Sequence, residues 1–194
     1  LQLKSLDKHY NDKSRWIEPI GVWDSFRVAK KSIPNNRFNG EYKDWFWAHG
    51  SHNGYREINA THKRWIALKV SKNKSVIFII IDTIFSEKAV KWRRWFHLSE
   101  QASAFNWSFW PLNSKGKLLK NGSYYSVDFG KTYKRPLLES TGIFKPGLNR
   151  VITVFSNKND VIDFRNASSL KGLIKIKKDV EIHWNEETIP HFKN

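Results

Sequence analysis

The fold is decided by three stretches of sequence: HKRWIALKV at residues 62–70, SVIFIIID at 75–82 and VKWRRWFHL at 90–98. In the first and third, side chains of different character alternate, which is the pattern of a strand with one buried face. The second is a continuous β-branched run, which is typical of a strand covered on both faces. In the third stretch, the alternation puts Val90, Trp92, Arg94, Phe96 and Leu98 on an interior face and Lys91, Arg93, Trp95 and His97 on a basic, aromatic face.

Further strands are predicted on the C-terminal side of these three. The segments 117–120 and 123–128 flank Asn121-Gly122, the strongest hairpin dipeptide, and strands are also predicted at 151–156, 173–176 and 180–184. Residues 30–53 carry Pro, several Asn and Gly among their aromatic residues, so a loop or a broken edge strand is expected there.

These patterns predict an all-β fold, an antiparallel β-sandwich of about nine or ten strands with little helix. No Gly-, Ser- or Pro-rich linker divides the chain, so residues 1–194 are expected to form a single domain. Residues 1–15 are polar without a clear period, and the sequence leaves open whether this lead-in is ordered.

The composition favours a folded protein with a polyanionic partner. Hydrophobic residues make up 40% of the 194 residues, and 34 Lys and Arg against 18 Asp and Glu give a net charge of +16. Such a field attracts nucleic acid, acidic polysaccharide or anionic lipid headgroups. The Lys residues form no run of five or more, so a nucleic-acid tail is not indicated, and the scatter also suits a genome that simply decorates surfaces with Lys.

Absent residue types exclude several kinds of site. Without Cys there are no disulfides, thiolate metal sites or Cys nucleophiles, although the redox compartment stays open. The chain has no Met and begins at Leu1, so we expect a processed form or a piece of something longer. The longest apolar run, 76–81, is far shorter than the ~18–20 residues of a membrane span, and no span is expected.

Four side chains raise the question of a metal site. His49 and His52 form an H-x-x-H pair, with His62 and Asp82 further along the chain. Residues three apart on a strand face opposite sides, so only a tight Gly50-Ser51 loop could bring both imidazoles to one zinc ion. We therefore assign no metal ligand, and Asp82 is interpreted as a turn or cap acceptor at the end of its strand.

No catalytic residue is assigned from the sequence. There is no G-x-S-x-G elbow and no phosphate-binding loop. The carboxylates Asp44, Glu57, Asp82 and Glu100 lie apart in unlike contexts, so a hydrolytic pair cannot be nominated.

The candidates that remain are aromatic and basic residues that could bind a ligand. Aromatic faces stack on sugar rings or bases, and Arg or His pairs with carboxylate, sulfate or phosphate. Among these candidates, Tyr42, Trp45 and Trp47 lie in the expected loop and are expected to be exposed. In contrast, Trp65, Trp92 and Phe96 are expected in the core. The candidate binding residues are Tyr42, Trp45, Trp47, His52, Tyr55, Arg56, His62, Arg64, Arg93 and His97.

The order of several motifs resembles a known family. The motifs are FRV (26–28), an aromatic loop, HNGYREIN (52–59), ATHKRWIAL (60–68), VIFIIIDTI (76–84) and WRRWFHL (92–98). Together they resemble the C-terminal β-sandwich of the heparinase II/III-like polysaccharide lyases. In that family a Gly-Tyr strand leads to a His-x-Arg strand, then to a strand ending in Asp and to one closing on Phe-His-Leu. The similarity covers approximately residues 20–110.

The resemblance implies β-elimination rather than hydrolysis. In such lyases the uronate carboxylate is neutralised, a Tyr or His removes the C5 proton, and a Tyr or His protonates the leaving oxygen. The family's N-terminal helical toroid is missing from this sequence. Also missing are the His-x-His-x-Asp, Asp-Pro-Gly and Ala-His-Asn stretches that supply the sheet-domain catalytic His and the metal ligands. Consequently no such role transfers to His49, His52 or His62, no cofactor is expected in this chain, and a divalent metal of the family would lie on residues outside it.

Two hypotheses follow. In the first, the chain is the C-terminal sheet domain of a lyase that acts on an acidic, uronate-containing polysaccharide, is inactive alone, and has the helical toroid of the same parent chain as its partner. The family resemblance favours a periplasmic or extracellular location. In the second, the chain is a self-standing, non-catalytic module that binds an acidic glycan or other polyanion through residues 42–55 and the basic face of 91–97.

Overall fold

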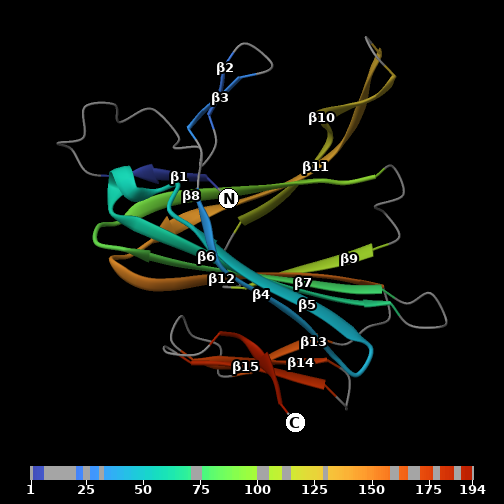
Figure 1. The fold of residues 1–194 in the computed structure, drawn as a ribbon. Coiled ribbons are helices and arrows are strands. Elements are labelled where there is room, and N and C mark those ends of the chain that lie inside the picture. Colours follow the sequence, from blue (N-terminus) through green and yellow to red (C-terminus); the bar gives the residue numbers. More distant parts are fainter. Residues whose placement is uncertain are drawn as a thin grey trace.

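Three antiparallel sheets stacked in layers make up the structure, a computed structural model (Figure 1). It describes residues 2–6, 21–23, 27–30, 33–70, 76–99, 105–110, 115–128, 131–157, 162–165, 171–176, 180–185 and 189–193. Among these residues no helix is long and apolar enough to cross a membrane. The predicted all-β, antiparallel sandwich class is confirmed.

The central sheet has six strands in the order β4-β5-β6-β7-β12-β9. On one side of it lies the β8 sheet, in the order β1-β8-β11-β10, and on the other side lies the C-terminal sheet, in the order β13-β14-β15-β16 (Figure 1). The central strands are β4 (Pro34–Tyr42), β5 (Trp45–His52), β6 (Ala60–Val70), β7 (Val76–Ser86), β12 (Gly147–Asn157) and β9 (Phe105–Trp110).

The two covering sheets have four strands each. Those of the β8 sheet are β1 (Gln2–Ser5), β8 (Val90–His97), β11 (Lys131–Phe144) and β10 (Lys115–Asp128). Those of the C-terminal sheet are β13 (Ile162–Arg165), β14 (Gly172–Ile176), β15 (Val180–Trp184) and β16 (His191–Phe192). A separate ribbon pairs β2 (Gly21–Trp23) with β3 (Arg27–Lys30), and one 3-10 turn, η1 (Arg56–Ile58), precedes β6.

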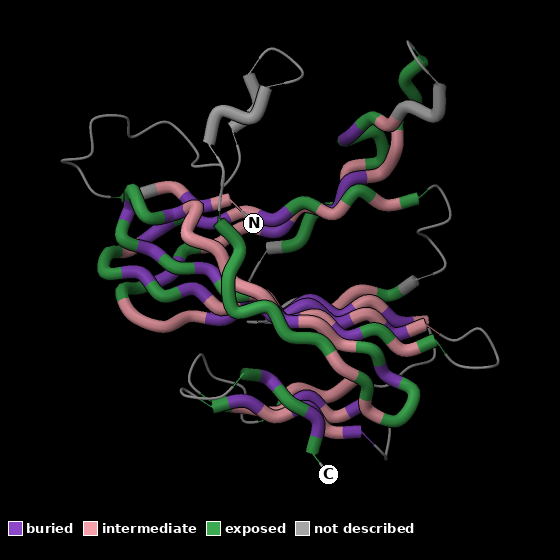
Figure 2. The backbone as a smooth tube through the Cα atoms, in the orientation of Figure 1, coloured by how far each residue is buried: buried purple, intermediate pink, exposed green. Residues whose placement is uncertain are grey.

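Each interface between layers has its own core, and β7 contributes to both (Figure 2). Ile79 and Ile81 belong to the core shared with the C-terminal sheet, whereas Ile84 belongs to the core shared with the β8 sheet. All three side chains are fully buried. The continuous β-branched run of β7 is therefore explained, because both faces of this strand are covered by other layers.

Of the two alternatives expected for residues 30–53, the structure has the broken edge strand rather than the loop. Residues 34–52 form the β4–β5 hairpin, in which β4 lies at the edge of the central sheet and its register with β5 shifts between Asn35 and Phe38. Lys43 is in the left-handed region at the turn. Pro34 and the Asn residues are accepted because β4 is an edge strand, which needs fewer backbone partners. With these and several short strands included, the three sheets hold more strands than the nine or ten expected.

The prediction of a hairpin at Asn121-Gly122 is wrong. Those residues lie inside the single strand β10, where the ladder with β11 is irregular between Leu119 and Ser123. A Cβ on Gly122 would lie 2.7 Å from Leu119 Cβ and 2.8 Å from Leu137 Cβ. Gly122 thus lets Leu119 and Leu137 pack closely against the backbone of a bulged strand. Glycine serves here for close packing within a strand rather than for a turn.

Part of the predicted lead-in is placed by the structure. β1 pairs with β8, with Leu3 opposite Trp92, and the Leu3 side chain is fully buried. Residues 7–15 of the lead-in lie outside the described residues.

Candidate functional site

A buried carboxylate, Asp82, organises the most highly charged cluster of the described interior. It lies within β7 directly opposite Arg64 of β6, and its side chain is fully buried. Arg64 donates to both carboxylate oxygens, through Nε at 2.7 Å and Nη2 at 3.2 Å. Arg94, which reaches down from β8, donates its Nη1 at 3.1 Å. The interpretation of Asp82 as a turn or cap acceptor is wrong, because it sits mid-strand and binds side chains from two sheets.

Two imidazoles extend this cluster along one line of hydrogen bonds. The backbone N–H of Gly54 donates to His52 Nδ1 at 3.1 Å, so in the neutral ring the proton of His52 lies on Nε2. That Nε2 faces His62 Nδ1 at 2.8 Å, and His62 Nε2 faces Asp82 Oδ1 at 2.7 Å. One backbone amide thereby sets both tautomers, with every N–H directed toward Asp82.

The electrostatics keep Asp82 charged and both rings neutral. Burial opposes the charge on Asp82, but the Arg64 and Arg94 guanidiniums and the His62 bond outweigh it and hold its pKa well below the usual range. The same carboxylate raises the pKa of Arg64. Burial lowers the pKa of Arg94 to about 10, which leaves it protonated at neutral pH. Burial, aided by neighbouring positive charge, lowers the pKa of His62 and takes that of His52 to about 4.

The cluster consequently carries one surplus positive charge, from two guanidiniums against one carboxylate. This charge reaches solvent at Arg64, whose side chain is 40% exposed, whereas those of Asp82 and Arg94 are 0% and 1% exposed. His52 lies beside it and is half-buried. The arrangement can hold an anion against Arg64, because the guanidinium is fixed in place and keeps further N–H donors beyond the two that Asp82 accepts.

The same bonds make the cluster a poor source of acid–base chemistry. Both ring nitrogens of His52 and of His62 are already in hydrogen bonds. Neither ring therefore presents a free lone pair to a substrate proton.

Tyr55 completes the wall of the cluster without being exposed. It is fully buried, and its ring centroid lies 5.3 Å from that of His52 and 6.1 Å from that of His62. Arg56, the next residue, is exposed on η1 and faces solvent. Of the ten predicted binding residues, the structure brings four together here: His52, Tyr55, His62 and Arg64.

Arg93 and His97 lie on the other face of β8 from Arg94, as the alternation in the sequence predicts. The Arg93 guanidinium stacks over the Trp95 ring at 4.2 Å and its Nε donates to Gln2 Oε1 at 2.5 Å. His97 is exposed. These two residues form a separate basic face of the β8 sheet.

The remaining three predicted residues lie on the opposite face of the central sheet. Tyr42 and Trp47 are half-buried and line a cavity beside the C-terminal sheet. Trp45 is fully buried, with its ring 5.4 Å from that of Phe192. The expectation that Trp45 is exposed is wrong, because it belongs to a strand that is covered by another layer rather than to a loop.

Metal binding has little to support it among the described residues, where no group of three or more His, Cys, Asp or Glu could hold an ion. His49 and His52 lie on opposite faces of β5, as the strand argument predicts. His49 contacts the Asn36 carbonyl through Nδ1 at 3.1 Å, whereas His52 faces His62.

Sequence reasoning missed Asp82 and Arg94 as partners. A signal was present in each case. Asp82 is the one acidic residue in the apolar run 76–84, and Arg94 falls on the interior face of the 90–98 alternation. Two opposite charges on buried faces indicate a pair, because an unpaired buried charge is too costly to retain.

The lowered His pKa values predict that stability falls as the solution is acidified. In the unfolded chain both rings take up a proton near pH 6.5, whereas in the folded chain they resist it until about pH 4 for His52. The unfolded state therefore binds more protons in this window, and stability rises with pH across it. For His52 we expect a loss of about 2 kcal/mol between pH 7 and pH 4, discounted for its partial exposure.

Denaturant unfolding followed from pH 7.5 to pH 4.5 measures this dependence. The variant His52→Gln should flatten the curve by close to one proton. An equal slope in wild type and His52→Gln would contradict the neutral-ring assignment.

Comparison with solved structures supports the fold. No family model and no curated protein matches the sequence. Among solved structures, the chain is similar to "Heparinase III-BT4657 gene product", with a TM-score of 0.55 and 15% identity over 84% of this chain. It is also similar to the heparan sulfate lyase HepC from Pedobacter heparinus, with a TM-score of 0.56 and 15% identity over 88% of this chain.

The similarity involves 29% and 30% of the lengths of those two proteins. At this level of identity the comparison establishes the fold, and it confirms the resemblance that the strand motifs indicated. The chain shares the fold of one part, rather than the whole, of heparinase III-type lyases.

Proposed function

We propose that this chain is the sheet portion of a polysaccharide lyase that acts on an acidic, uronate-containing polysaccharide by β-elimination. Its contribution is to bind the acidic groups of the polymer, while the acid–base residues belong to other parts of the parent protein. The observation that carries the proposal is the surplus positive charge at Arg64, held by Asp82 and open to solvent. The shared fold with heparinase III over most of the chain supports it.

Arg64 is suited to neutralise a carboxylate or a sulfate. Its bidentate contact with Asp82 removes the side-chain freedom that binding would otherwise have to suppress. The positive charge is needed in the β-elimination reaction because withdrawal of charge from the uronate carboxylate acidifies the C5 proton. His52 and His62 position Asp82 and are fully used in doing so, which is why we expect little or no turnover from the chain alone.

The turnover part of the proposal has a direct test. The purified chain is incubated with heparan sulfate, hyaluronan and alginate while the absorbance of the unsaturated uronate is recorded. No sustained increase is expected. Steady product formation would contradict the claim that other parts of the parent protein are needed.

The binding part of the proposal is tested with a matched pair of variants. Arg64→Gln should weaken binding of heparan sulfate by about tenfold, a loss of ~1.4 kcal/mol, as measured by calorimetry at low salt. Arg93→Gln removes the same charge from the outer face of the β8 sheet and should change the affinity less than Arg64→Gln does. Thermal melts of both variants check that the fold is kept. Equal affinity of wild type and Arg64→Gln would overturn the assignment of Arg64.

A non-catalytic binding module is a second candidate, favoured by the outer face of the β8 sheet. That face of β8 carries Lys91, Arg93, Trp95 and His97, and Trp95 is 40% exposed. The Trp95 indole is held in place because its Nε1 donates to Glu139 at 2.9 Å while Arg93 stacks on the ring. A basic surface with a fixed aromatic ring suits a linear polyanion. In the same calorimetric experiment, a larger loss for Arg93→Gln than for Arg64→Gln would favour this module.

A further inference from the structure

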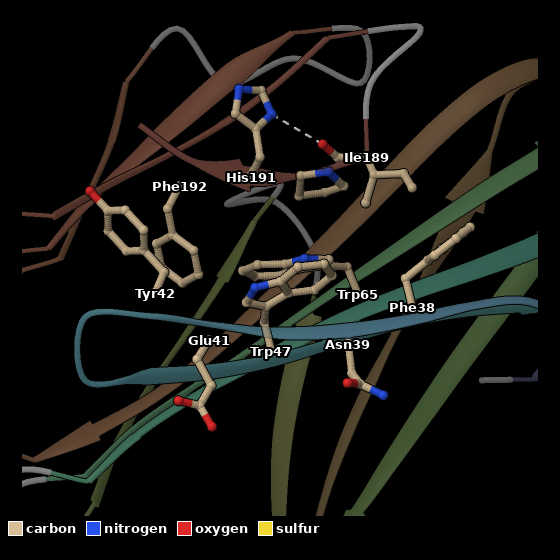
Figure 3. Close-up of a pocket in the computed structure, with 10 residues that line it drawn as sticks. Phe38, Asn39, Glu41, Tyr42, Trp47, Trp65, Ile189, His191 and Phe192 are labelled. Carbon is tan, nitrogen blue, oxygen red and sulfur yellow. Dashed lines mark hydrogen bonds between the residues drawn. The ribbon is translucent and has the colours of Figure 1, made fainter. Parts of the chain in front are cut away.

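A cavity of about 450 Å³ lies between the β4–β5 hairpin and the C-terminal segment 189–193 (Figure 3). It opens on the side of the central sheet that faces away from Asp82. The lining is dominated by rings, from Phe38, Tyr42, Trp47, Trp65 and Phe192. Its size falls in the range of small-molecule sites, which are concave and mainly apolar with a few polar groups.

The floor of the cavity is a tryptophan that lies flat on a glycine. Gly40 is directly opposite Trp47 in the β4–β5 ladder, and a Cβ on Gly40 would lie 2.8 Å from Trp47 Cζ2. Only a glycine lets the indole rest on the backbone of β4. One face of the ring is thereby covered by the strand, and the other face is turned to the cavity, which Trp47 lines.

One wall is fixed by contacts of the C-terminal segment. The rings of Tyr42 and Phe192 are stacked with centroids 4.8 Å apart and an interplanar angle of 8°. The Tyr42 hydroxyl also donates to the carbonyl of Lys193 at 2.6 Å. The ring of His191, which lines the cavity, contacts the Ile189 carbonyl through Nδ1 at 3.1 Å, so the neutral ring keeps Nε2 as an acceptor. The cavity is therefore preformed rather than assembled by a ligand.

Two lysines lie beside this wall. Lys43 lies with Nζ 5.2 Å from the Tyr42 ring centroid, and Lys193 is largely exposed with its Nζ 3.8 Å from the Glu181 carboxylate. Asn39 and Glu41 also line the cavity, but they belong to the alternate positions of β4 and their side chains point away from the rings (Figure 3). The Glu41 carboxylate is thus directed away from the rings.

We infer that this cavity binds one sugar unit of an acidic polysaccharide. The apolar C–H face of a pyranose ring stacks on the open face of Trp47, as flat rings of biological ligands do on aromatic side chains. Lys43 pairs with an acidic substituent of the sugar or of its neighbour, whereas Lys193 is already paired with Glu181. The site lies on the opposite face of the central sheet from Arg64, so it holds the polymer at a second point and is independent of the acid-binding role proposed for the cluster.

Calorimetry with a hyaluronan hexasaccharide and with cellohexaose, a neutral chain of equal length, tests the inference. Trp47→Ala should weaken hyaluronan hexasaccharide binding by about tenfold or more, from the ~1–3 kcal/mol typical of stacking on an aromatic ring. Trp47→Phe keeps a ring and should lose less. Tyr124→Ala, which removes a 60% exposed ring on β10, is the control and should bind as wild type does. Cellohexaose should bind more weakly than the acidic hexasaccharide.

A second substitution separates lost binding from lost folding. Gly40→Ala keeps every side chain of the lining but lifts the Trp47 ring off β4, so it should also weaken binding. Gly50→Ala in the adjacent strand, where a Cβ meets only Arg37 Cγ at 3.9 Å, should have no effect. Thermal melts accompany all variants.

Three outcomes would overturn the inference. They are equal hexasaccharide affinity of wild type and Trp47→Ala, equal or tighter binding of cellohexaose, and absence of hexasaccharide binding to the wild type. The function proposed for Arg64 is decided separately by the heparan sulfate experiment with Arg64→Gln. If Arg64→Gln weakened heparan sulfate binding while Trp47→Ala left hexasaccharide binding unchanged, the cavity would not be a sugar-binding site. The binding role of Arg64 would still stand.

Discussion

Asp82→Asn is expected to lower the free energy of unfolding by about 3 to 5 kcal/mol, the range found when one partner of a buried ion pair is removed. The amide has the shape of the carboxylate but no charge. It removes the negative charge that Arg94, which is 1% exposed, and Arg64 both contact. Its NH₂ group would also face a donor, since Arg64 and Arg94 together donate to both oxygens of Asp82.

Asp44→Asn is the matched control for this substitution. Asp44 pairs with Lys69 at 2.6 Å, but its side chain is 50% exposed, so the loss should be within ~1 kcal/mol. Denaturant unfolding at pH 7 measures both variants. If Asp82→Asn were as mild as Asp44→Asn, the cluster would not be a buried network.

Asp82 and the two histidines all make the protein less stable as the pH falls, but for different reasons. The folded chain holds Asp82 in its charged form and the histidines in their neutral form. The pKa of Asp82 is held well below its usual value in the folded chain. Its contribution to stability is thus complete above the unfolded pKa of ~3.9 and is lost as pH falls toward the folded pKa. Asp82→Asn should remove this acid-sensitive part of the unfolding curve, while the part above pH 4 that belongs to the histidines remains.

Gly142→Ala is the second substitution expected to have a large effect. A Cβ at this position in β11 would lie 2.8 Å from three atoms of the Trp92 ring. Trp92 is 2% exposed and stacks on Phe144 with centroids 5.3 Å apart, so the indole has no free space to move into. Overpacking of a filled core costs about 1 to 3 kcal/mol, and we expect the upper end of that range.

Gly50→Ala again serves as the control, because its new methyl group meets nothing closer than 3.9 Å. Its effect should be within about 0.5 kcal/mol of zero. Thermal or denaturant unfolding of the two variants gives the comparison directly. Equal stability of Gly142→Ala and Gly50→Ala would mean that Trp92 can be displaced at no cost, against the packing described for this core.

The sequence predicted strands best where the side-chain pattern depends on burial alone. β7 was visible because a strand buried on both faces is apolar throughout, and β8 because one face of it is basic. For residues 30–53 the sequence leaves a loop and a broken edge strand open, because Asn, Gly and Pro are tolerated in both and the edge position is known only when the sheet is assembled. Asn121-Gly122 misled for a related reason, since Gly122 makes room for neighbouring side chains within β10.

Three of the five polar side chains in the Asp82 cluster could be predicted from sequence, and two could not. His52, His62 and Arg64 were candidates because they are close in sequence and of the right chemistry. Arg94 arrives from another sheet and Asp82 from the next strand, so their meeting depends on the layer order rather than on spacing. The cavity is a stronger case, because Ile189–Phe192 is separated from Trp47 by most of the chain and has no motif of its own.

Arg64 and Trp65 are neighbours in β6, yet one serves the charged cluster and the other lines the ring-walled cavity on the opposite face. Point substitutions can therefore alter either surface during evolution while sparing the other. An insertion or deletion of one residue within β6 cannot do so, because it would exchange the two faces and place a guanidinium among the rings and an indole beside Asp82. We expect natural length variation in this protein's lineage to avoid β6 and to collect in the loops around it.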